Sequence, residues 1–225
     1  MEKSNIDEKI KLLTGSGMWH TQEVEGLPSV HLSDGPHGLR KQEEKERQNN
    51  VSLVSTCYPT ASALACSWDV TAAERLGGAV AKEAWNADVA VLLGPGINMK
   101  RSPLCGRNFE YFSEDPFLAG RLGAAYVSAA QGEDVAVSLK HFAANNQETN
   151  RQTSNSQIDE RALREIYLSA FEYVVKTARP ATVMASYNRL NGYYACENRH
   201  LLTEILREEW GFDGVVISDW GACAD

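Results

Sequence analysis

The chain of 225 residues is 43% hydrophobic and carries a formal net charge of −8 at pH 7. This composition is typical of an ordinary soluble globular protein, and the length suits one domain or most of one. The acidic balance argues against a nucleic-acid partner, since no basic patch would neutralise phosphates, and no apolar stretch reaches the ~20 residues that a membrane span requires.

The first predicted element is a charged amphipathic helix over residues 1–13, with Ile6, Ile10 and Leu13 on one side. After it come six short apolar runs, each of which stops at a polar or glycine-containing segment. Such a run is typical of a buried parallel strand whose carboxyl end carries the polar group. The six predicted strands span residues 30–33, 63–66, 89–93, 135–139, 181–186 and 215–218.

Helical patterns lie between most of these strands, and they span residues 70–85, about 116–130, 159–177 and 201–209. Asp69 is the expected cap of the first helix, and Gly211 follows the last one as a stop signal. The third helix has apolar residues every fourth position, which predicts one buried face: Ala162, Ile166, Ala170 and Val174. Alternating strands and helices predict a parallel sheet with right-handed crossovers.

Six βα-type units leave two interpretations of the fold. A closed, TIM-like (β/α)8 barrel needs eight units and typically ~250 residues, so the chain is either a complete open α/β sheet or a barrel without its last two units. The long polar stretch 41–52, an expected exposed loop, follows the first strand. Long loops at strand carboxyl ends are common on the active-site face of barrels. The expected fold class is therefore α/β, an incomplete (β/α)8-type barrel of about six units.

The cysteines and histidines indicate neither a disulfide framework nor a metal site. The five cysteines are odd in number, widely spaced and without a metal-type pair motif, and the five histidines are scattered. The N-terminal segment has no signal-peptide hydrophobic region, so we expect reduced thiols in the cytoplasm. The glycine-containing segments 15–17 and 94–96 lack the context of a phosphate loop. We therefore expect no metal and no cofactor.

Polar side chains gather where the predicted strands end, at Asp34, Lys140, His141, Tyr187 and Asp219. Loops just after strands add further groups: Arg107, Asn108, Glu110, Asn145, Asn146, Glu148 and Arg151. The carboxyl ends of parallel strands are where chemistry takes place in such folds, and this set suits an uncharged, polyhydroxylated ligand such as a sugar. Lys140 follows an apolar strand directly and needs a partner, because a buried unpaired charge is costly.

Three aromatic residues, Trp68, Tyr187 and Trp220, lie at or just beyond predicted strand ends. They could stack on the face of a pyranose ring. The alternative is that they only plug the mouth of the barrel, and the sequence leaves both interpretations open.

Several stretches together resemble the N-terminal barrel domain of family 3 glycoside hydrolases, which includes many β-glucosidases. They occur in the family order and span nearly the whole chain, at residues 33–38, 106–110, 113–116, 140–142, 145–151, 186–188, 211–214 and 218–220. The resemblance implies that residues 1–225 are the N-terminal portion of a catalytic barrel domain, with the remaining barrel units and a following α/β domain absent. It also implies a β-glucoside or short β-linked oligosaccharide as substrate.

The resemblance assigns roles to the matched residues. Asp219 takes the place of the catalytic nucleophile, which attacks the anomeric carbon and forms a covalent glycosyl-enzyme. We expect nearby cations such as Arg151 to lower the pKa of Asp219 and keep it ionised. The residues that would hold the sugar are Asp34, Arg107, Lys140, His141, Arg151 and Tyr187. Trp220 is a further substrate-binding candidate, from its position just beyond a predicted strand rather than from the resemblance.

The chain departs from the family in lacking a recognisable general acid. Retaining hydrolysis needs a second carboxyl ~5 Å from the nucleophile, and in glucosidase-type members it comes from a later domain. In hexosaminidase-type members a loop histidine serves, but here Phe142 is followed by Ala143-Ala144-Asn145-Asn146 rather than the Pro-Gly-His-Gly segment of that type. The resemblance therefore implies a nucleophile and a sugar-binding floor whose acid is supplied elsewhere.

Two other functions compete with a retaining β-glucosidase. One is a sugar-binding fragment without turnover, although such a module has no need of a nucleophile at Asp219. The other is an aldolase that forms a Schiff base on Lys140, since such lysines lie on barrel strands. The sequence does not indicate an oligomeric state.

Overall fold

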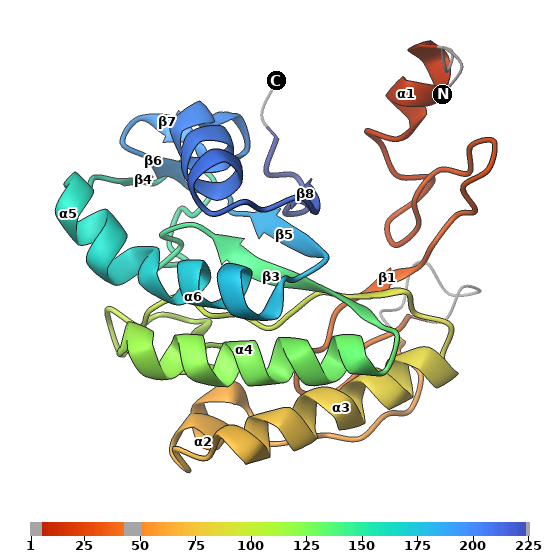
Figure 1. Cartoon of the computed structure of the whole chain (residues 1–225), viewed down its shortest axis with the longest axis horizontal. Coiled ribbons are helices and arrows are strands. Elements are labelled where there is room, and N and C mark those ends of the chain that lie inside the picture. The colour runs from red at the N-terminus through yellow and green to blue at the C-terminus, as the bar shows by residue number, and fades with distance from the viewer. Residues whose placement is uncertain (1–5, 43–50, 224–225) are drawn as a thin grey trace.

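The structure is a computed structural model, and it describes residues 6–42 and 51–223. Five parallel strands form its main sheet, in the order β1-β2-β3-β5-β8, and Figure 1 shows this sheet curled into half a barrel. The strands are β1 (Leu32–Ser33), β2 (Val91–Leu92), β3 (Ala136–Phe142), β5 (Thr182–Ala185) and β8 (Val215–Ser218). The expected α/β class is confirmed, but the main sheet contains five strands rather than the expected six or so βα units.

The predicted strand at residues 63–66 is wrong, because this segment forms helix α2 (Ala61–Ala65). The Thr60 side chain accepts a hydrogen bond from the Ala63 N–H at 3.2 Å and so caps the helix. Alanine has the highest helix propensity, and an apolar run of four residues does not by itself distinguish a strand from a buried helix.

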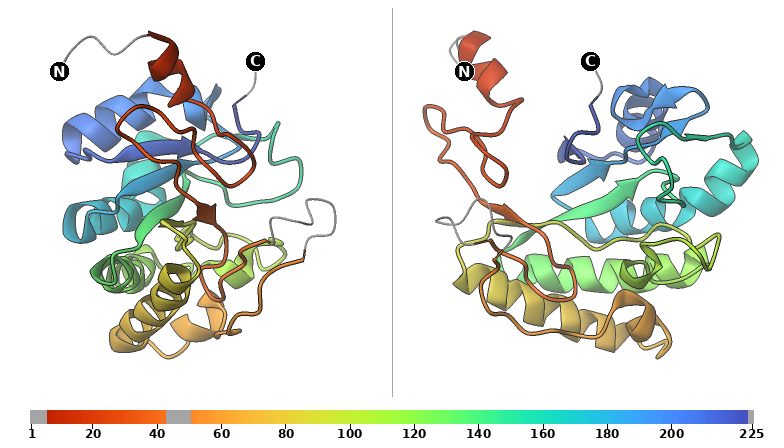
Figure 2. Two further views of the ribbon diagram at one scale, coloured as in Figure 1. Left: turned by 90° about the vertical axis from the view of Figure 1, so that its right-hand side faces the viewer. Right: turned by 180° about the vertical axis from the view of Figure 1, so that it is seen from behind.

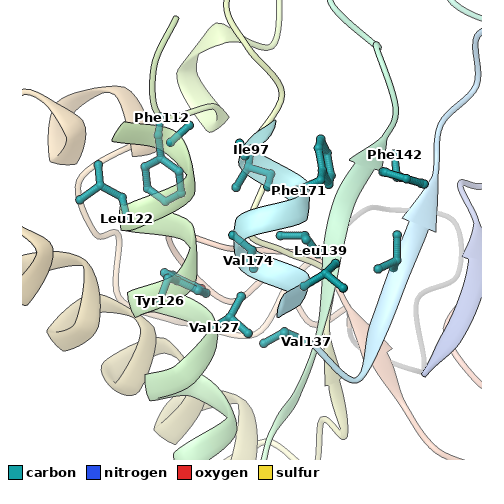
Figure 3. Close-up of a cluster of buried hydrophobic side chains, with 14 of the residues drawn as sticks. Ile97, Phe112, Leu122, Tyr126, Val127, Val137, Leu139, Phe142, Phe171 and Val174 are labelled. Carbon is teal, nitrogen blue, oxygen red and sulfur yellow. The ribbon is translucent and has the colours of Figure 1, made fainter. Parts of the chain in front are cut away.

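Helices cover one face of the curled sheet, as the two views of Figure 2 show. They are α3 (Val70–Asn86), α4 (Pro116–Gly132), α6 (Ser169–Ala178) and the π-helical η4 (His200–Glu209). Asp69 caps α3, with Oδ1 2.8 Å from the Thr71 N–H, and Gly211 ends η4 with a φ of 73°. Both signals were predicted. Figure 3 shows the core between β3, α4 and α6, where Leu122, Tyr126, Val137, Leu139, Phe171 and Val174 are buried.

The predicted helix at residues 159–177 contains a π-helical turn, η2 (Leu163–Tyr167), between α5 (Glu160–Ala162) and α6. The Leu168 N–H donates to the Leu163 carbonyl at 2.8 Å across this turn. The wider turn changes which side chains face the core. Leu163 and Leu168 are buried, whereas Ile166 is 37% exposed. The predicted buried face is therefore correct for Ala170 and Val174, which follow the turn, but not for Ile166, which lies within it.

Three smaller features complete the described chain. Helix α1 (Ile6–Lys11) is shorter than predicted and buries no side chain. A second, three-stranded sheet contains β4 (Asn155–Ser156), β6 (Arg189–Leu190) and β7 (Tyr193–Tyr194), and the 3-10 turns η1 (Asn108–Glu110) and η3 (Ala195–Glu197) lie in loops. Most of the predicted polar loop, residues 43–50, lies outside the described residues. Within residues 6–42 and 51–223, the helices are all too short or too polar to cross a membrane.

Candidate active site

The carboxyl ends of the five parallel strands bring most of the predicted site residues together. Asp34 follows β1, Lys140 and His141 lie near the end of β3, Tyr187 lies two residues after β5, and Asp219 follows β8. In-register parallel pairing causes this convergence: Ser33 lies opposite Leu92, and Ala185 lies opposite both Phe142 and Ser218. The register between β3 and β5 shifts between Leu139 and Phe142, at the Lys140–His141 position.

Lys140 is buried, at 3% exposure, and it has the partners that its position requires. Its Nζ lies 3.4 Å from Asp34 Oδ1 and 3.6 Å from Glu110 Oε2. Glu110 also accepts a hydrogen bond from the Nε–H of Arg107. Burial acts to raise the pKa of Glu110, but Lys140 and Arg107 outweigh burial and leave this pKa lowered. The Glu110 carboxylate thus stays ionised between two cations.

His141 is completely enclosed and contacts three polar side chains. Its Nε2 lies 2.8 Å from Arg107 Nη2 and 3.5 Å from Asp219 Oδ2, and its Nδ1 lies 3.0 Å from Tyr111 Oη. The Asn98 side chain binds both main-chain polar groups of His141, at 2.6 and 2.8 Å. Burial lowers the pKa of His141 well below its ordinary value, and the cations Arg107 and Lys140 lower it further. His141 is therefore neutral at physiological pH.

Asp219 is 8% exposed, and its two carboxylate oxygens differ. Oδ1 accepts the main-chain N–H of Trp220 at 2.8 Å, while the buried Oδ2 accepts no hydrogen bond from the described residues. Burial raises the pKa of Asp219 above its ordinary value, against the opposing effects of the Trp220 N–H, Tyr187, Arg107 and Lys140. The expectation of a lowered pKa is wrong, because desolvation outweighs the nearby cations.

Arg151 lies beside the site and packs on Tyr187. Its guanidinium carbon lies 4.3 Å from the centroid of the Tyr187 ring, and Nη1 donates to Glu148 Oε2 at 2.8 Å. Burial raises the pKa of Tyr187 to about 12, with the Asp219 charge as the next cause. Tyr187 therefore keeps its proton and can donate a hydrogen bond to an oxygen.

The two tryptophans differ in their surroundings. Trp220 Nε1 donates to the Met18 carbonyl at 2.8 Å, and its ring lies against Trp19 with centroids 5.3 Å apart. The N-terminal segment thus contacts the loop that carries Asp219. Trp68 follows helix α2 rather than a strand and is 74% exposed, so the reason for placing it at a strand end no longer holds.

Two buried residues of this network were not predicted, Asn98 and Tyr111. Both lie in the long connection between β2 and α4, and both bind His141 across more than 25 residues of sequence. No local sequence pattern predicts these two contacts. They depend on the tertiary structure, because the packing of the sheet decides which loop lies beside β3. The described part of the chain contains no group of three or more His, Cys, Asp or Glu that could hold a metal.

Comparison with known proteins agrees with this geometry. The fold and the site define a parallel (β/α) half-barrel with a polar cluster at the carboxyl ends of its strands. Residues 36–225 match the family model described as the glycosyl hydrolase family 3 N terminal domain. The chain belongs to glycosyl hydrolase family 3.

Relatives and solved structures extend the comparison. The chain is 53% identical to the thermostable beta-glucosidase B of Acetivibrio thermocellus, over 100% of this chain and 30% of that protein. An exo-alpha-(1->6)-L-arabinopyranosidase of Bifidobacterium longum is 51% identical over 98% of this chain and 30% of the relative. The crystal structure of a β-glucosidase from Bifidobacterium adolescentis superimposes with a TM-score of 0.93 and 50% identity, covering 99% of this chain and 32% of that one.

Proposed function

We propose that this chain carries the nucleophile and the sugar-binding floor of a retaining β-glucosidase. Asp219 Oδ2 attacks the anomeric carbon, a C–O bond to Asp219 forms as the glycosidic bond breaks, and water later releases the sugar. One observation carries the proposal: Oδ2 is buried just after β8 without a hydrogen-bond donor from the described residues, in a site where Lys140, Arg107 and Tyr187 act on the Asp219 carboxyl and carry N–H or O–H groups that could donate to sugar oxygens. A β-glucosidase structure from Thermotoga neapolitana, 43% identical with a TM-score of 0.91, is in complex with glucose.

The leaving group needs a proton, and neither nearby glutamate is suited to supply it. A general acid needs a raised pKa, but the pKa of Glu110 is lowered by Lys140 and Arg107, against the effect of burial. Glu148 is held by Arg151 at 2.8 Å and by the Asn145 amide at 3.2 Å. This chain matches 30% of the length of its Acetivibrio relative. We infer that the acid/base residue comes from a segment beyond this chain.

The substrate that we propose is a terminal β-D-glucoside or a short β-linked oligosaccharide. An α-L-arabinopyranoside is the second candidate, because a relative that is 51% identical bears the name of an arabinopyranosidase. This sugar lacks the C6 hydroxymethyl group of glucose. Comparing kcat/KM for the p-nitrophenyl derivatives of both sugars, in a protein that includes the acid/base segment, decides between them.

Two alternatives are weaker than glycoside hydrolysis. An aldolase needs a lysine amine that is free to attack a carbonyl, whereas Lys140 Nζ is engaged by two carboxylates, at 3.4 Å from Asp34 Oδ1 and 3.6 Å from Glu110 Oε2. A sugar-binding fragment without turnover would not need the unpartnered Asp219 Oδ2, whose burial is costly.

The deciding experiment is covalent labelling. A 2-deoxy-2-fluoro β-glucoside with a dinitrophenyl leaving group needs little protonation, so it should glycosylate Asp219 even without the general acid. We expect mass spectrometry of the digested chain to find the label on Asp219 and to find none in the Asp219→Asn variant. A label on another residue would contradict the assignment of the nucleophile.

A further inference from the structure

Tyr111 is completely buried beside His141 and can adopt few other positions. The two rings meet edge to face, with centroids 5.9 Å apart and planes at 77°. Gly96 also lies against the Tyr111 ring, where a Cβ at Gly96 would come within 2.9 Å of two ring carbons. Burial raises the pKa of Tyr111 well above its ordinary value, so it remains a hydroxyl group.

Arg107 favours one of the two positions for the proton of His141. A guanidinium has only N–H donors and is not deprotonated in proteins. Because Arg107 Nη2 lies 2.8 Å from His141 Nε2, this nitrogen must accept the hydrogen bond. An imidazolium, or a neutral ring protonated on Nε2, would place two N–H groups against each other. The one proton of the neutral ring is therefore on Nδ1, 3.0 Å from Tyr111 Oη.

We propose that Tyr111 is a positioning residue that holds His141 as the Nδ1–H tautomer, so that His141 presents no N–H to Asp219 Oδ2. The neighbouring Nε2 lies 3.5 Å from Oδ2 and would donate to it in the other tautomer. A hydrogen bond to Oδ2 would stabilise its charge and weaken it as a nucleophile. The role assigned to Tyr111 rests on the proposed function of Asp219, but the tautomer itself does not.

The first test uses the unmutated 225-residue chain with 15N-labelled histidine, below its melting temperature. Long-range 1H–15N correlation spectra distinguish protonated from unprotonated ring nitrogens, and comparison with His141→Gln assigns the signals. We expect Nδ1 protonated and Nε2 unprotonated at neutral pH. A proton on Nε2, or on both nitrogens, overturns the proposal whatever the variants show.

The second test removes only the hydroxyl, in Tyr111→Phe. The buried Nδ1–H then loses its acceptor, so we expect a minor but measurable fraction of His141 to move its proton to Nε2, against the opposing Arg107 guanidinium, and to donate it to Asp219. The control is Tyr126→Phe, because Tyr126 is also buried and donates to the Pro36 carbonyl at 2.7 Å. We expect this control to leave the His141 tautomer unchanged. If Tyr111→Phe also leaves it unchanged, Tyr111 does not position His141.

The tautomer and the labelling of Asp219 are independent readouts. An unlabelled Asp219 with the proton on His141 Nδ1 contradicts the proposed function alone. A labelled Asp219 with the proton on Nε2 contradicts this inference alone.

Discussion

At the scale of single residues, Asp219 shows a conflict between burial and charge. Its pKa is raised in the folded chain, with burial as the first cause. A carboxyl with a raised folded pKa contributes stability that is complete below its unfolded pKa and is lost as the pH rises through the folded value. The ionised Asp219 therefore lowers the free energy of unfolding at neutral pH.

This linkage predicts that Asp219→Asn raises the melting temperature at pH 7 while it abolishes turnover. The gain should shrink as the pH falls into the acidic range, where the wild-type carboxyl takes up its proton in the folded chain before it does so in the unfolded chain. Calorimetric melts across this range check the sign. Glu110→Gln is the matched control of opposite sign, since the pKa of Glu110 is lowered in the fold by Lys140 and Arg107 despite burial. It should lower the melting temperature at pH 7.

The proposed sugar-binding floor gives a second prediction at this scale. In a protein that includes the acid/base segment, Asp34→Ala, Lys140→Ala and His141→Ala should each lower kcat/KM by about 10- to 100-fold or more. Hydrogen bonds to a charged side chain contribute ~1.5–3 kcal/mol, and removal of the neutral His141 leaves its buried partners Arg107 and Tyr111 unpaired at a cost of about 1–3 kcal/mol. Contacts that strengthen in the transition state also affect kcat. Assays on an aryl β-glucoside measure this. Near-normal kinetics in all three variants would refute the sugar-binding floor.

At the scale of elements, helices α3 and α4 pack more closely than two ordinary helices can, because Gly77 has no side chain. A Cβ at Gly77 would lie 2.4 Å from the main-chain oxygen of Tyr126 in α4. The adjacent Gly78 has open space, with only Glu133 Oε1 at 3.9 Å. The same substitution at neighbouring positions of one helix should therefore have opposite effects.

We expect Gly77→Ala to destabilise the fold by ~1–3 kcal/mol or more, because helix α4 must move to relieve the overlap. Gly78→Ala should stabilise it by up to ~1 kcal/mol, since alanine favours a helix interior. Urea unfolding monitored by circular dichroism gives both values. Equal effects of the two variants would mean that α3 and α4 do not meet at Gly77.

The elements also show where prediction from the sequence succeeds. Five of the six predicted strands, the cap at Asp69 and the stop at Gly211 are present. These signals are local, because a run of β-branched residues or a capping side chain acts within a few residues. The segment 63–66 was predicted wrongly because a short apolar run does not by itself distinguish a strand from a helix, and the turn at residues 163–167 was missed because no local pattern marked it.

At the scale of the whole molecule, the curled sheet ends in two edges, β1 and β8, within the described residues. Val215 on β8 is 60% exposed, and unpaired strand edges favour aggregation. We expect the 225-residue chain alone to be marginally stable and nearly inactive on unactivated substrates, because protonation of the leaving group typically contributes ~10²–10⁴-fold. A dinitrophenyl β-glucoside should still react slowly.

The test of this prediction is a thermal melt of the purified chain, with assays on p-nitrophenyl and dinitrophenyl β-glucosides and on an unactivated β-linked disaccharide. A sharp cooperative melt together with full turnover of the disaccharide would show that an acid lies within the chain. Glu110 and Glu148 would then be the residues to replace.

The sequence by itself determined the fold class, the family resemblance and which polar residues lie at the ends of strands. These properties follow from hydrophobic runs, turn residues and short motifs, all of which are local. Only the tertiary structure decided that Asp219 Oδ2 accepts no hydrogen bond from the described residues, that burial raises the Asp219 pKa and that Tyr111 contacts His141. The physical reason is that hydrogen bonds and desolvation depend on distances between segments far apart in sequence, and these distances are set by strand register and packing.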